Sequence, residues 1–542
     1  INMKIGTIDV VIILVYLVGI VAVGLLSARS KEKMTGEGYF LAGRGLKWGS
    51  IGAALFASNI STIHLTGLAA EGYRVGLVAG NYEWMATFTL LLLAMIFAPF
   101  YIKTKISTLP EFLEKRYDSR SRTILAIIAI IGALFIHIGI SLYAGAIVFE
   151  KFFGLDIYVS IIGISVITAI YTVAGGLKAV VITENIQTVI LLLGSIILTG
   201  LAIVAVQDTG IETIEQLKAA LKPDQLKMLH SGDSEIGKEG MAWYMFFLGY
   251  PILGIWYWCT DQTIVQRVLG AKTVEDAQKG ALFAGVLKFL PPFILILPGT
   301  LAYVLFQQDI TDPNQALPVL INELLPTGLK GIFAAALLAA LMSTIAAALN
   351  SCSSLVALDV VKRVKPNLSD DDQVKIGRYT AVGVMIIAIL WSTQGDKFGS
   401  IFEAINNMAG ALAPPVATVF LLGVFYKKGT KDAAFYTLLI GLILGITLFL
   451  IDFKPISGAS YITDMGIPFL MRTWWVFCIC CVLYLIISAI TPKSDPEVIA
   501  ETTFANPSDI FKRREGKTGL QDIRVLAGLL FAALVILYSV FG

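Results

Sequence analysis

Apolar stretches, each long enough to cross a bilayer, follow one another along most of the chain, with short polar segments between them. About 20 apolar residues in a helix span the ~30 Å hydrocarbon core, and backbone groups in lipid must find hydrogen-bond partners inside their own segment. The pattern therefore predicts an all-α polytopic membrane protein with 14 transmembrane helices. These helices are expected at residues 8–27, 49–75, 79–104, 122–152, 157–174, 180–207, 240–267, 277–306, 328–362, 374–395, 398–426, 432–452, 470–491 and 520–541.

The composition agrees with this interpretation. Of the 542 residues, 56% are hydrophobic and 15% are charged, and the mean hydropathy is +0.79. A soluble chain of this length would suggest several domains, but helices that share one bilayer form one packed unit. The first apolar stretch lacks a small-residue cleavage site, so we expect a retained helix rather than a signal peptide. Because the chain opens with Ile1, we also expect its true start to lie upstream.

The distribution of charge predicts the orientation in the membrane. If the N-terminus is outside, about 23 Lys and Arg lie in the inward loops and about 7 in the outward loops and tails, as the positive-inside rule requires. The outward loops at 208–239 and 307–327 are acidic, and an even number of crossings places both termini outside. The inward segment 493–519 is polar and ends in a basic run, which we interpret as a solvated linker and topology anchor.

All five cysteines lie inside apolar stretches. Cys478, Cys480 and Cys481 have the spacing of a metal site, but no His or acid lies close to them in the sequence, so we expect them to serve packing. The outward loops carry neither a cysteine pair nor an Asn-x-Ser/Thr acceptor. This pattern favours a bacterial inner membrane over an animal plasma membrane.

Two groups of five predicted helices follow the first helix. Because five is odd, the second group inserts upside-down relative to the first, which is the arrangement of an inverted repeat with its pseudo-two-fold axis in the membrane plane. The predicted units are a peripheral first helix with an inward loop (1–48), the first repeat (49–207), an outward acidic loop (208–239), the second repeat (240–426) and three peripheral helices (427–542).

Helix 49–75 carries a polar run at mid-membrane depth, Ala57-Ser58-Asn59-Ile60-Ser61-Thr62-Ile63-His64. Such residues are costly in lipid unless they face a cavity or one another, and Ser, Asn and Thr compete for backbone hydrogen bonds. We therefore expect the helix to unwind here and to free carbonyls such as those of Ala57 and Ile60. The alternative is a polar patch that joins helices.

Helix 328–362 carries two adjacent hydroxyls, Ser343 and Thr344. Sodium is a hard cation that prefers oxygen ligands. These hydroxyls, a carbonyl of the same segment and the carbonyls of Ala57 and Ile60 would supply five oxygens. The alternative is that each hydroxyl bonds back to its own helix.

Several other polar groups lie inside predicted helices. Glu83 and Lys288 have opposite charges, which implies that they pair or bind a ligand. A neutral polyhydroxy ligand suits both, because a carboxylate accepts hydroxyl protons and an ammonium donates to oxygens; a structural ion pair is the alternative. His64 and His137 are intramembrane, and each could instead be a satisfied core residue. The run 255–262, IWYWCTDQ, offers aromatic rings that could stack on a sugar.

Together these residues resemble the sodium:solute symporter family, in particular its sodium/glucose cotransporter branch, over nearly the whole chain. The segments that carry the resemblance are FASNIST (56–62), EW (83–84), YTVAGGLKA (171–179), YWCTDQTIVQR (257–267), LKFLPPF (287–293), LMST with LNS (341–344, 349–351) and APP (413–415). The resemblance implies a leucine-transporter-like 5+5 inverted repeat that works by alternating access.

The resemblance also implies the roles of single residues. The sodium site would consist of the carbonyls of Ala57, Ile60 and Ala340 and the hydroxyls of Ser343 and Thr344. The substrate-binding residues would be Asn59, His64, Glu83, His137, Tyr257, Trp258, Lys288 and Asn406, and Tyr257 is similar to the family's inner gate. His137 stands where sugar-transporting relatives have Asn or Lys, Asn406 where they usually have Gln, and Gly254 where a polar residue is common. These departures leave the particular sugar open.

Relatives with a second sodium site resemble one another in having an Asp in helix 180–207 and hydroxyl residues one turn past the first site. Here the corresponding residues are Glu184, Ala346 and Ala347, and only Ser343 keeps an oxygen. We therefore predict one sodium ion per substrate molecule. Glu184 is expected either to be solvated near the inner surface or to pair with Lys178, unless it binds a second ion.

The predicted function is sodium-coupled secondary active symport of a glucose- or galactose-like monosaccharide, with sodium as the coupling ion. No cofactor, covalent chemistry or nucleic-acid partner is expected. The nearest alternative is symport of myo-inositol or an acidic sugar. A remote alternative is a sugar-gated sensor or channel, but a sensor would append a signalling domain and a channel would need a ring of filter residues.

Overall fold

The computed structural model describes residues 5–29, 34–394, 401–512 and 517–542. Within these ranges the regular structure is helical, apart from an isolated bridge between Leu46 and Ala271. The predicted all-α class is therefore confirmed. The first residues of predicted helix 398–426 and the basic residues 513–514 lie outside the described residues.

Eleven helices of the described chain are long and apolar enough to cross a membrane. Seven of them are α1 (Thr7–Ala28), α10 (Ile157–Asp208), α19 (Asp370–Ser392), α20 (Ile401–Phe425), α21 (Lys431–Asp452), α24 (Phe469–Ile490) and α26 (Ile523–Phe541). Four more are built from successive pieces joined by 3-10 or π turns: α4 (Thr62–Val75) with α5 (Asn81–Leu92) and α6 (Ala98–Lys103); α8 (Ser119–Ile131) with α9 (Ser141–Phe153); α14 (Val274–Leu287) with α15 (Leu297–Phe306); and α17 (Leu329–Ser354) with α18 (Lys362–Val364).

Shorter helices connect or extend these. They are α2 (Gly36–Leu41), α3 (Trp48–Asn59), α7 (Leu109–Arg116), α11 (Ile214–Ala220), α12 (Trp243–Gly254), α13 (Gln262–Leu269), α16 (Ala316–Leu324), α22 (Lys454–Ser457), α23 (Tyr461–Asp464) and α25 (Pro496–Thr502).

The predicted boundaries and the helices differ in three places. The predicted helices 157–174 and 180–207 form the single element α10, and 79–104 is joined to the second half of 49–75. The predicted helix 240–267 is instead divided into α12 and α13, each shorter than a bilayer is thick. Hydropathy locates apolar residues but does not locate bends and breaks between them, so the number of 14 crossings stays a prediction.

Gly176 bends α10 sharply. Its dihedrals are φ +57° and ψ −150°, which side chains with a Cβ rarely adopt, and a Cβ there would lie 2.2 Å from the carbonyl oxygen of Tyr39 in α2. The two arms of α10, before and after Gly176, therefore run as separate helices. The bend lies in the YTVAGGLKA segment and explains the second of its two glycines.

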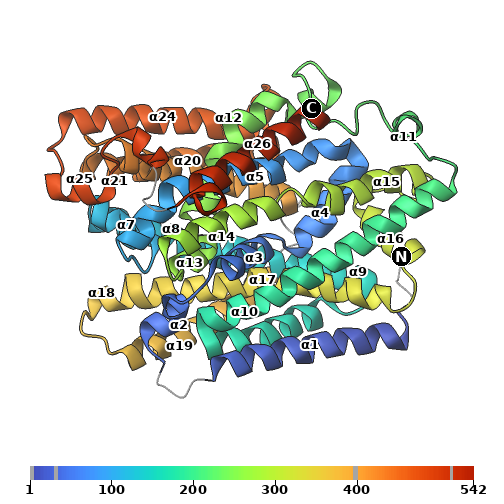
Figure 1. The fold of residues 1–542 in the computed structure, drawn as a ribbon, viewed down its shortest axis with the longest axis horizontal. Coiled ribbons are helices and arrows are strands. Elements are labelled where there is room, and N and C mark those ends of the chain that lie inside the picture. Colours follow the sequence, from blue (N-terminus) through green and yellow to red (C-terminus); the bar gives the residue numbers. More distant parts are fainter. Residues whose placement is uncertain (1–4, 30–33, 395–400, 513–516) are drawn as a thin grey trace.

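The helix α17 forms the centre of the molecule. Of the 18 residues in its most apolar stretch, 94% are buried. In α1, which lies at the edge of the bundle (Figure 1), only 17% of such residues are buried. Alanine fills much of α17, with Ala334, Ala335, Ala336, Ala339 and Ala340 all buried. Small side chains let neighbouring helices approach closely in a membrane, so α17 can contact helices on every side.

Both termini lie at the same end of the helix bundle (Figure 1). Near the N-terminus, the Asp9 carboxylate accepts hydrogen bonds from the backbone N–H groups of Gly328 (2.6 Å) and Gly331 (2.7 Å) at the start of α17. Near the C-terminus, the Phe541 carbonyl accepts a 2.6 Å hydrogen bond from the N–H of Met228. The two ends of the chain are thus fixed beside the predicted outward loops 307–327 and 208–239.

Candidate functional site

The polar run in the predicted helix 49–75 breaks that helix, as expected. The helix α3 ends at Asn59, Ile60 is extended (φ −79°, ψ 103°), Ser61 is extended (φ −97°, ψ 171°), and α4 begins at Thr62. The Ser61 hydroxyl lies 2.9 Å from Nδ1 of His64, and the Ser61 N–H donates to the same nitrogen at 3.3 Å. Ser61 and His64 therefore form a capping box that starts the second half of the helix.

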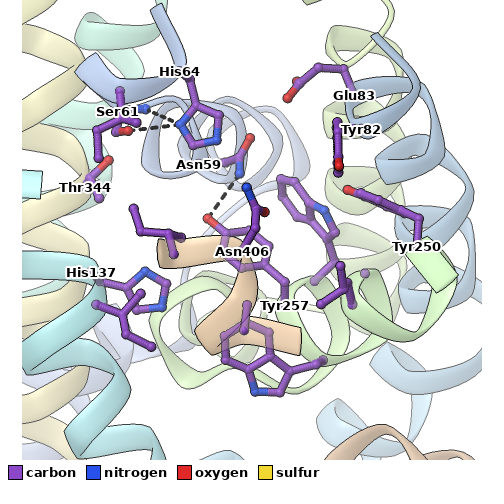
Figure 2. Close-up of a pocket in the computed structure, with 18 of the residues that line it drawn as sticks. Asn59, Ser61, His64, Tyr82, Glu83, His137, Tyr250, Tyr257, Thr344 and Asn406 are labelled. Atoms are coloured by element: carbon purple, nitrogen blue, oxygen red, sulfur yellow. Dashed lines mark hydrogen bonds between the residues drawn. The ribbon is translucent and has the colours of Figure 1, made fainter. Parts of the chain in front are cut away.

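This cap fixes how His64 faces the interior. Because Nδ1 accepts from Ser61, a neutral imidazole carries its proton on Nε2. The ring lines a cavity next to the break, where Nε2 can donate a hydrogen bond (Figure 2). The sequence signal was present as Ser-x-x-His, in which His replaces the usual Glu or Gln of a capping box.

The cavity has a volume of about 150 Å³ and lies where several interrupted helices meet. Its walls come from the break after α3, from α5, from the π turns at Gly132–Ile140 and Ile255–Thr260, from the end of α14 and from α20. All eight residues predicted to bind substrate line it: Asn59, His64, Glu83, His137, Tyr257, Trp258, Lys288 and Asn406. The fold thus brings together residues from distant parts of the sequence.

Glu83 and Lys288 form an ion pair in the wall of the cavity. Lys288 Nζ lies 2.5 Å from Glu83 Oε2, and it also donates to Oδ1 of Asn59. The two side chains are only 5% and 1% exposed, so neither charge could be kept without its partner. Lys288 Nζ also lies 5.3 Å from the centre of the Trp258 ring, close enough for a cation–π contact.

Lys288 lies at the end of α14, where the predicted continuous helix 277–306 is interrupted. The N–H groups of Phe289 and Leu290 bond three residues back, to the carbonyls of Val286 and Leu287, and two prolines follow. Proline lacks the N–H that would continue the helical ladder. This turn therefore directs the lysine side chain to the cavity.

A second pair of polar residues lies on the opposite wall. His137 Nε2 is 2.9 Å from Asp261 Oδ2, and the other oxygen of Asp261 accepts a 2.7 Å hydrogen bond from the N–H of Thr263 at the start of α13. Between the walls, the Asn59 side-chain amide donates to the Tyr257 hydroxyl at 3.1 Å (Figure 2). His137 thus has an acidic partner inside the bundle, and both the substrate role and the alternative of a satisfied core residue stay predictions for it.

The residues predicted to bind sodium also gather at the break. The Ser343 hydroxyl donates to the carbonyls of Ala57 (2.8 Å) and Ala340 (3.0 Å). The Thr344 hydroxyl donates to the carbonyls of Ser58 (3.2 Å) and Ala340 (3.2 Å). Two hydroxyls and three carbonyls thus meet between α3 and α17, and they are the hard oxygen donors that sodium prefers.

The prediction chose Ala57, Ile60 and Ala340 as the carbonyl ligands. Ala57 and Ala340 lie in the cluster, and Ser58 is a further carbonyl that the sequence did not single out. Ile60 lies at the break itself, between the two halves of the helix. The hydroxyls bond to their own helix and also across to α3, so back-bonding describes only half of their contacts.

Other residues of the cavity were missed. They are Ser61, Tyr82, Ser141 and Tyr250, together with apolar neighbours, whereas Trp256 belongs to the aromatic run 255–262 that the sequence analysis singled out. Tyr250 lies seven residues before Tyr257, which places both on one face of a helix, and Ser61 belongs to the polar run. The seven-residue spacing could have identified Tyr250, and the polar run could have identified Ser61. Figure 2 shows Tyr82 and Tyr250 beside Glu83.

Glu184 is neither solvated nor paired with Lys178, which were the two expected environments. It is fully buried, and its carboxylate pairs with the Arg267 guanidinium, with 2.9 Å between Nε and Oε2. Lys178 is exposed. The expectation of a solvated residue or a partner for Lys178 is therefore wrong, because the buried Arg267 of α13 pairs with Glu184 of α10. Ala346 and Ala347 are buried on α17, where they present methyl groups.

This combination of long apolar helices, a broken helix and an internal polar cavity defines a multi-pass membrane transporter. The model of the sodium:solute symporter family matches residues 39–441, and the chain belongs to that family. Sodium-coupled solute symport is therefore its function, with sodium as the coupling ion.

Two groups of relatives are similar over most of their length. The chain is 36% identical to the sodium/myo-inositol cotransporter 2 of Oryctolagus cuniculus over 489 residues, which cover 84% of this chain and 72% of that protein. It is 37% identical to the human protein of the same name over 481 residues, covering 82% and 70%. It is 33% identical to the sodium/glucose cotransporter 1 of Sus scrofa over 532 residues, covering 90% and 80%.

Solved structures share the fold. A Na⁺-coupled sialic acid symporter in a substrate-bound outward-open state aligns with a TM-score of 0.77 at 22% identity, over 90% of this chain and 99% of that one. The nucleobase-cation-symport-1 family transporter Mhp1 aligns with a TM-score of 0.55 at 14% identity, over 88% and 99%. At these identities the likeness establishes the fold alone.

Proposed function

We propose that the protein transports a neutral monosaccharide, of the glucose or galactose type, together with sodium by alternating access. The observation that carries this proposal is the cavity at the helix break, in which polar and aromatic side chains converge and the charges of Glu83 and Lys288 compensate each other. The substrate leaves unchanged, because the cavity binds and releases it without a covalent step. The closest alternative is myo-inositol, and an acidic sugar is a more distant one.

The charge balance of the cavity favours a neutral substrate. Glu83 and Lys288 neutralise each other at 2.5 Å, and His137 is engaged by Asp261 at 2.9 Å. An acidic sugar would bring a charge that needs an uncommitted cation, since an unpaired charge is costly in a buried site. A sugar hydroxyl can instead donate to the Glu83 carboxylate and accept from Lys288.

The named relatives support the same substrate class. The cotransporters of glucose and of myo-inositol carry neutral polyhydroxy molecules, which need hydrogen-bond donors and acceptors in place of a counter-ion. The cavity offers both kinds of group at His64, Asn59 and Glu83, and ring faces at Tyr257 and Trp258 for the C–H surface of a sugar.

The position of Thr344 explains how sodium and sugar could be coupled. This residue bonds to the Ser58 carbonyl in the oxygen cluster, and it also lines the cavity. Asn59, which follows Ser58 in the chain, contacts both Lys288 and Tyr257. An ion held by the cluster would fix the end of α3 and therefore the adjacent cavity wall, which would raise the affinity for sugar. Linkage then requires bound sugar to raise the sodium affinity by the same factor.

Tyr257 is proposed as the inner gate. Its hydroxyl is joined to Asn59 by the 3.1 Å hydrogen bond that spans the cavity, from the π turn at Ile255–Thr260 to the end of α3. Separation of these two elements would open that side. The bond to Asn59 therefore links gate opening to the helix break where sodium is proposed to bind.

The architecture that supports this mechanism is a 5+5 inverted repeat within 14 helices, at residues 49–207 and 240–426. Each group opens with an interrupted helix, at Ile60–Ser61 in the first and at Asp261 in the second. We place both termini outside and the protein in a bacterial inner membrane. The contacts of Asp9 with Gly328 and of Met228 with Phe541 support a common side for both termini.

Counterflow in proteoliposomes tests the proposed substrate. Vesicles loaded with unlabelled glucose should accumulate labelled glucose only when sodium is present, and a channel or sensor would show no such accumulation. Galactose should compete strongly, whereas glucuronate and sialic acid should not. Stronger competition by myo-inositol than by either hexose would select the alternative substrate, and competition by the acids would contradict the neutral cavity.

The ratio of sodium to substrate is expected to be one to one. A second ion would need oxygen ligands near Glu184, but that carboxylate is occupied by Arg267, and Ala346 and Ala347 offer no side-chain oxygen. Reversal-potential measurements with opposed sodium and sugar gradients in proteoliposomes give the ratio directly. A value near two would mean that Glu184 leaves Arg267 to bind a second ion.

A further inference from the structure

An open apolar groove runs along the outside of the helix bundle, away from the substrate cavity. It lies between the first arm of α10 and α19 and has a volume of about 660 Å³. Its lining is Val166, Ala169, Ile170, Val173, Ala174, Arg378, Val382, Met385, Ile386 and Ile389. Nine of these ten side chains are apolar, so the groove suits hydrocarbon along nearly its whole length.

Arg378 is the exception, and it lies at one end of the groove. One terminal nitrogen of its guanidinium donates to the Ala174 carbonyl at 3.2 Å, and the group lies 5.8 Å from the ring centre of Tyr39. Its Nε is buried and has no hydrogen-bond partner among the described residues. The guanidinium has five N–H donors and thus keeps donor capacity beyond the Ala174 carbonyl, which an acceptor at this end of the groove can use.

The length of the groove matches one leaflet of a bilayer. From Arg378 to Ile389 the helix rises by roughly 16 Å at 1.5 Å per residue, and half of a ~30 Å hydrocarbon core is about 15 Å. The residue after Arg378, Tyr379, is 76% exposed, which is typical of an aromatic side chain at the level of lipid headgroups. The charged end thus lies at headgroup depth and the apolar part at acyl-chain depth.

We propose that this groove is a binding site for a phospholipid. The lipid phosphate accepts hydrogen bonds from the terminal nitrogens of the Arg378 guanidinium, because phosphate oxygens match the fork of an arginine. One acyl chain lies along Val382, Ile386 and Ile389 on α19, against Ile170 on α10. The bound lipid would join α10 and α19, which belong to different predicted repeats.

Native mass spectrometry of the delipidated full-length protein tests this proposal, with phosphatidylglycerol as the probe. We expect one retained molecule, and retention at least about tenfold weaker for diacylglycerol, which lacks the phosphate, and for glycerophosphoglycerol, which lacks the chains. Arg378→Gln should lower phosphatidylglycerol retention to the level of diacylglycerol. Lys375→Gln removes an exposed charge on the same helix and should change nothing.

A second pair of variants leaves Arg378 intact. Ile386→Trp fills the groove and should prevent retention, whereas Ile387→Trp adds the same ring at a neighbouring exposed position outside the groove and should not. Equal retention by these two proteins would overturn the site, as would retention of phosphatidylglycerol by Arg378→Gln at the level of the unmodified protein. If Arg378→Gln does not fold, the tryptophan pair decides.

Discussion

Replacing Glu83 with Gln is expected to raise the half-saturating sugar concentration at least about tenfold, while the sodium dependence changes much less. A carboxylate accepts hydrogen bonds from sugar hydroxyls more strongly than a neutral amide does. The variant also leaves Lys288 buried with Asn59 as its remaining partner, so the cavity acquires an uncompensated positive charge. Initial rates of sodium-driven uptake in proteoliposomes, over a range of sugar concentrations, measure the effect.

Two further proteins separate binding from folding. Glu71→Gln removes a carboxylate that pairs with Arg74 away from the cavity, and it should leave the half-saturating sugar concentration unchanged. The double variant Glu83→Gln with Lys288→Met removes both charges; it should fold but should transport poorly. If the double variant instead recovers the original sugar affinity, Glu83 and Lys288 are a structural ion pair and do not contact the substrate.

The break in the predicted helix 49–75 could be predicted because its cause is local. Four polar residues in a short stretch at mid-membrane depth cannot face lipid, and the structure breaks the helix between Ile60 and Ser61. Glu83 and Lys288 were expected either to pair or to bind a ligand for a similar reason, since two opposite charges in apolar segments have few other partners, and the structure shows them paired. The resemblance of short motifs to a known family then supplied the remaining candidates.

The other ion pairs could not be predicted from single segments. Asp261 lies 124 residues from His137, and Glu184 lies 83 residues from Arg267, so each pairing depends on how whole helices pack. Lys178 is a cation close to Glu184 in the sequence, but its side chain is exposed, two residues after the bend at Gly176. Proximity along the chain was therefore a poor guide to the partner of Glu184.

Substituting Thr344 with Ala is expected to raise the half-saturating sodium concentration roughly 5- to 150-fold, the equivalent of roughly 1–3 kcal/mol. The hydroxyl is one of the few oxygens in the cluster between α3 and α17, and its loss also frees the Ser58 carbonyl from its partner. Because Thr344 also lines the cavity, apparent sugar affinity at low sodium should fall as well, and saturating sodium should largely restore it. Uptake measured across a grid of sodium and sugar concentrations shows both effects.

The matched controls lie on the same helix. Thr344→Ser keeps the hydroxyl and should restore most of the sodium affinity. Ser353→Ala removes a buried hydroxyl that, within the described part of the chain, bonds only to the Leu349 carbonyl of its own helix, at 2.9 Å, so it should leave sodium dependence unchanged. Equal effects of Thr344→Ala and Ser353→Ala would mean that a lost hydroxyl merely loosens α17. An unchanged sodium dependence in Thr344→Ala would remove this residue from the ion site and leave the coupling between α3 and the cavity without its proposed cause.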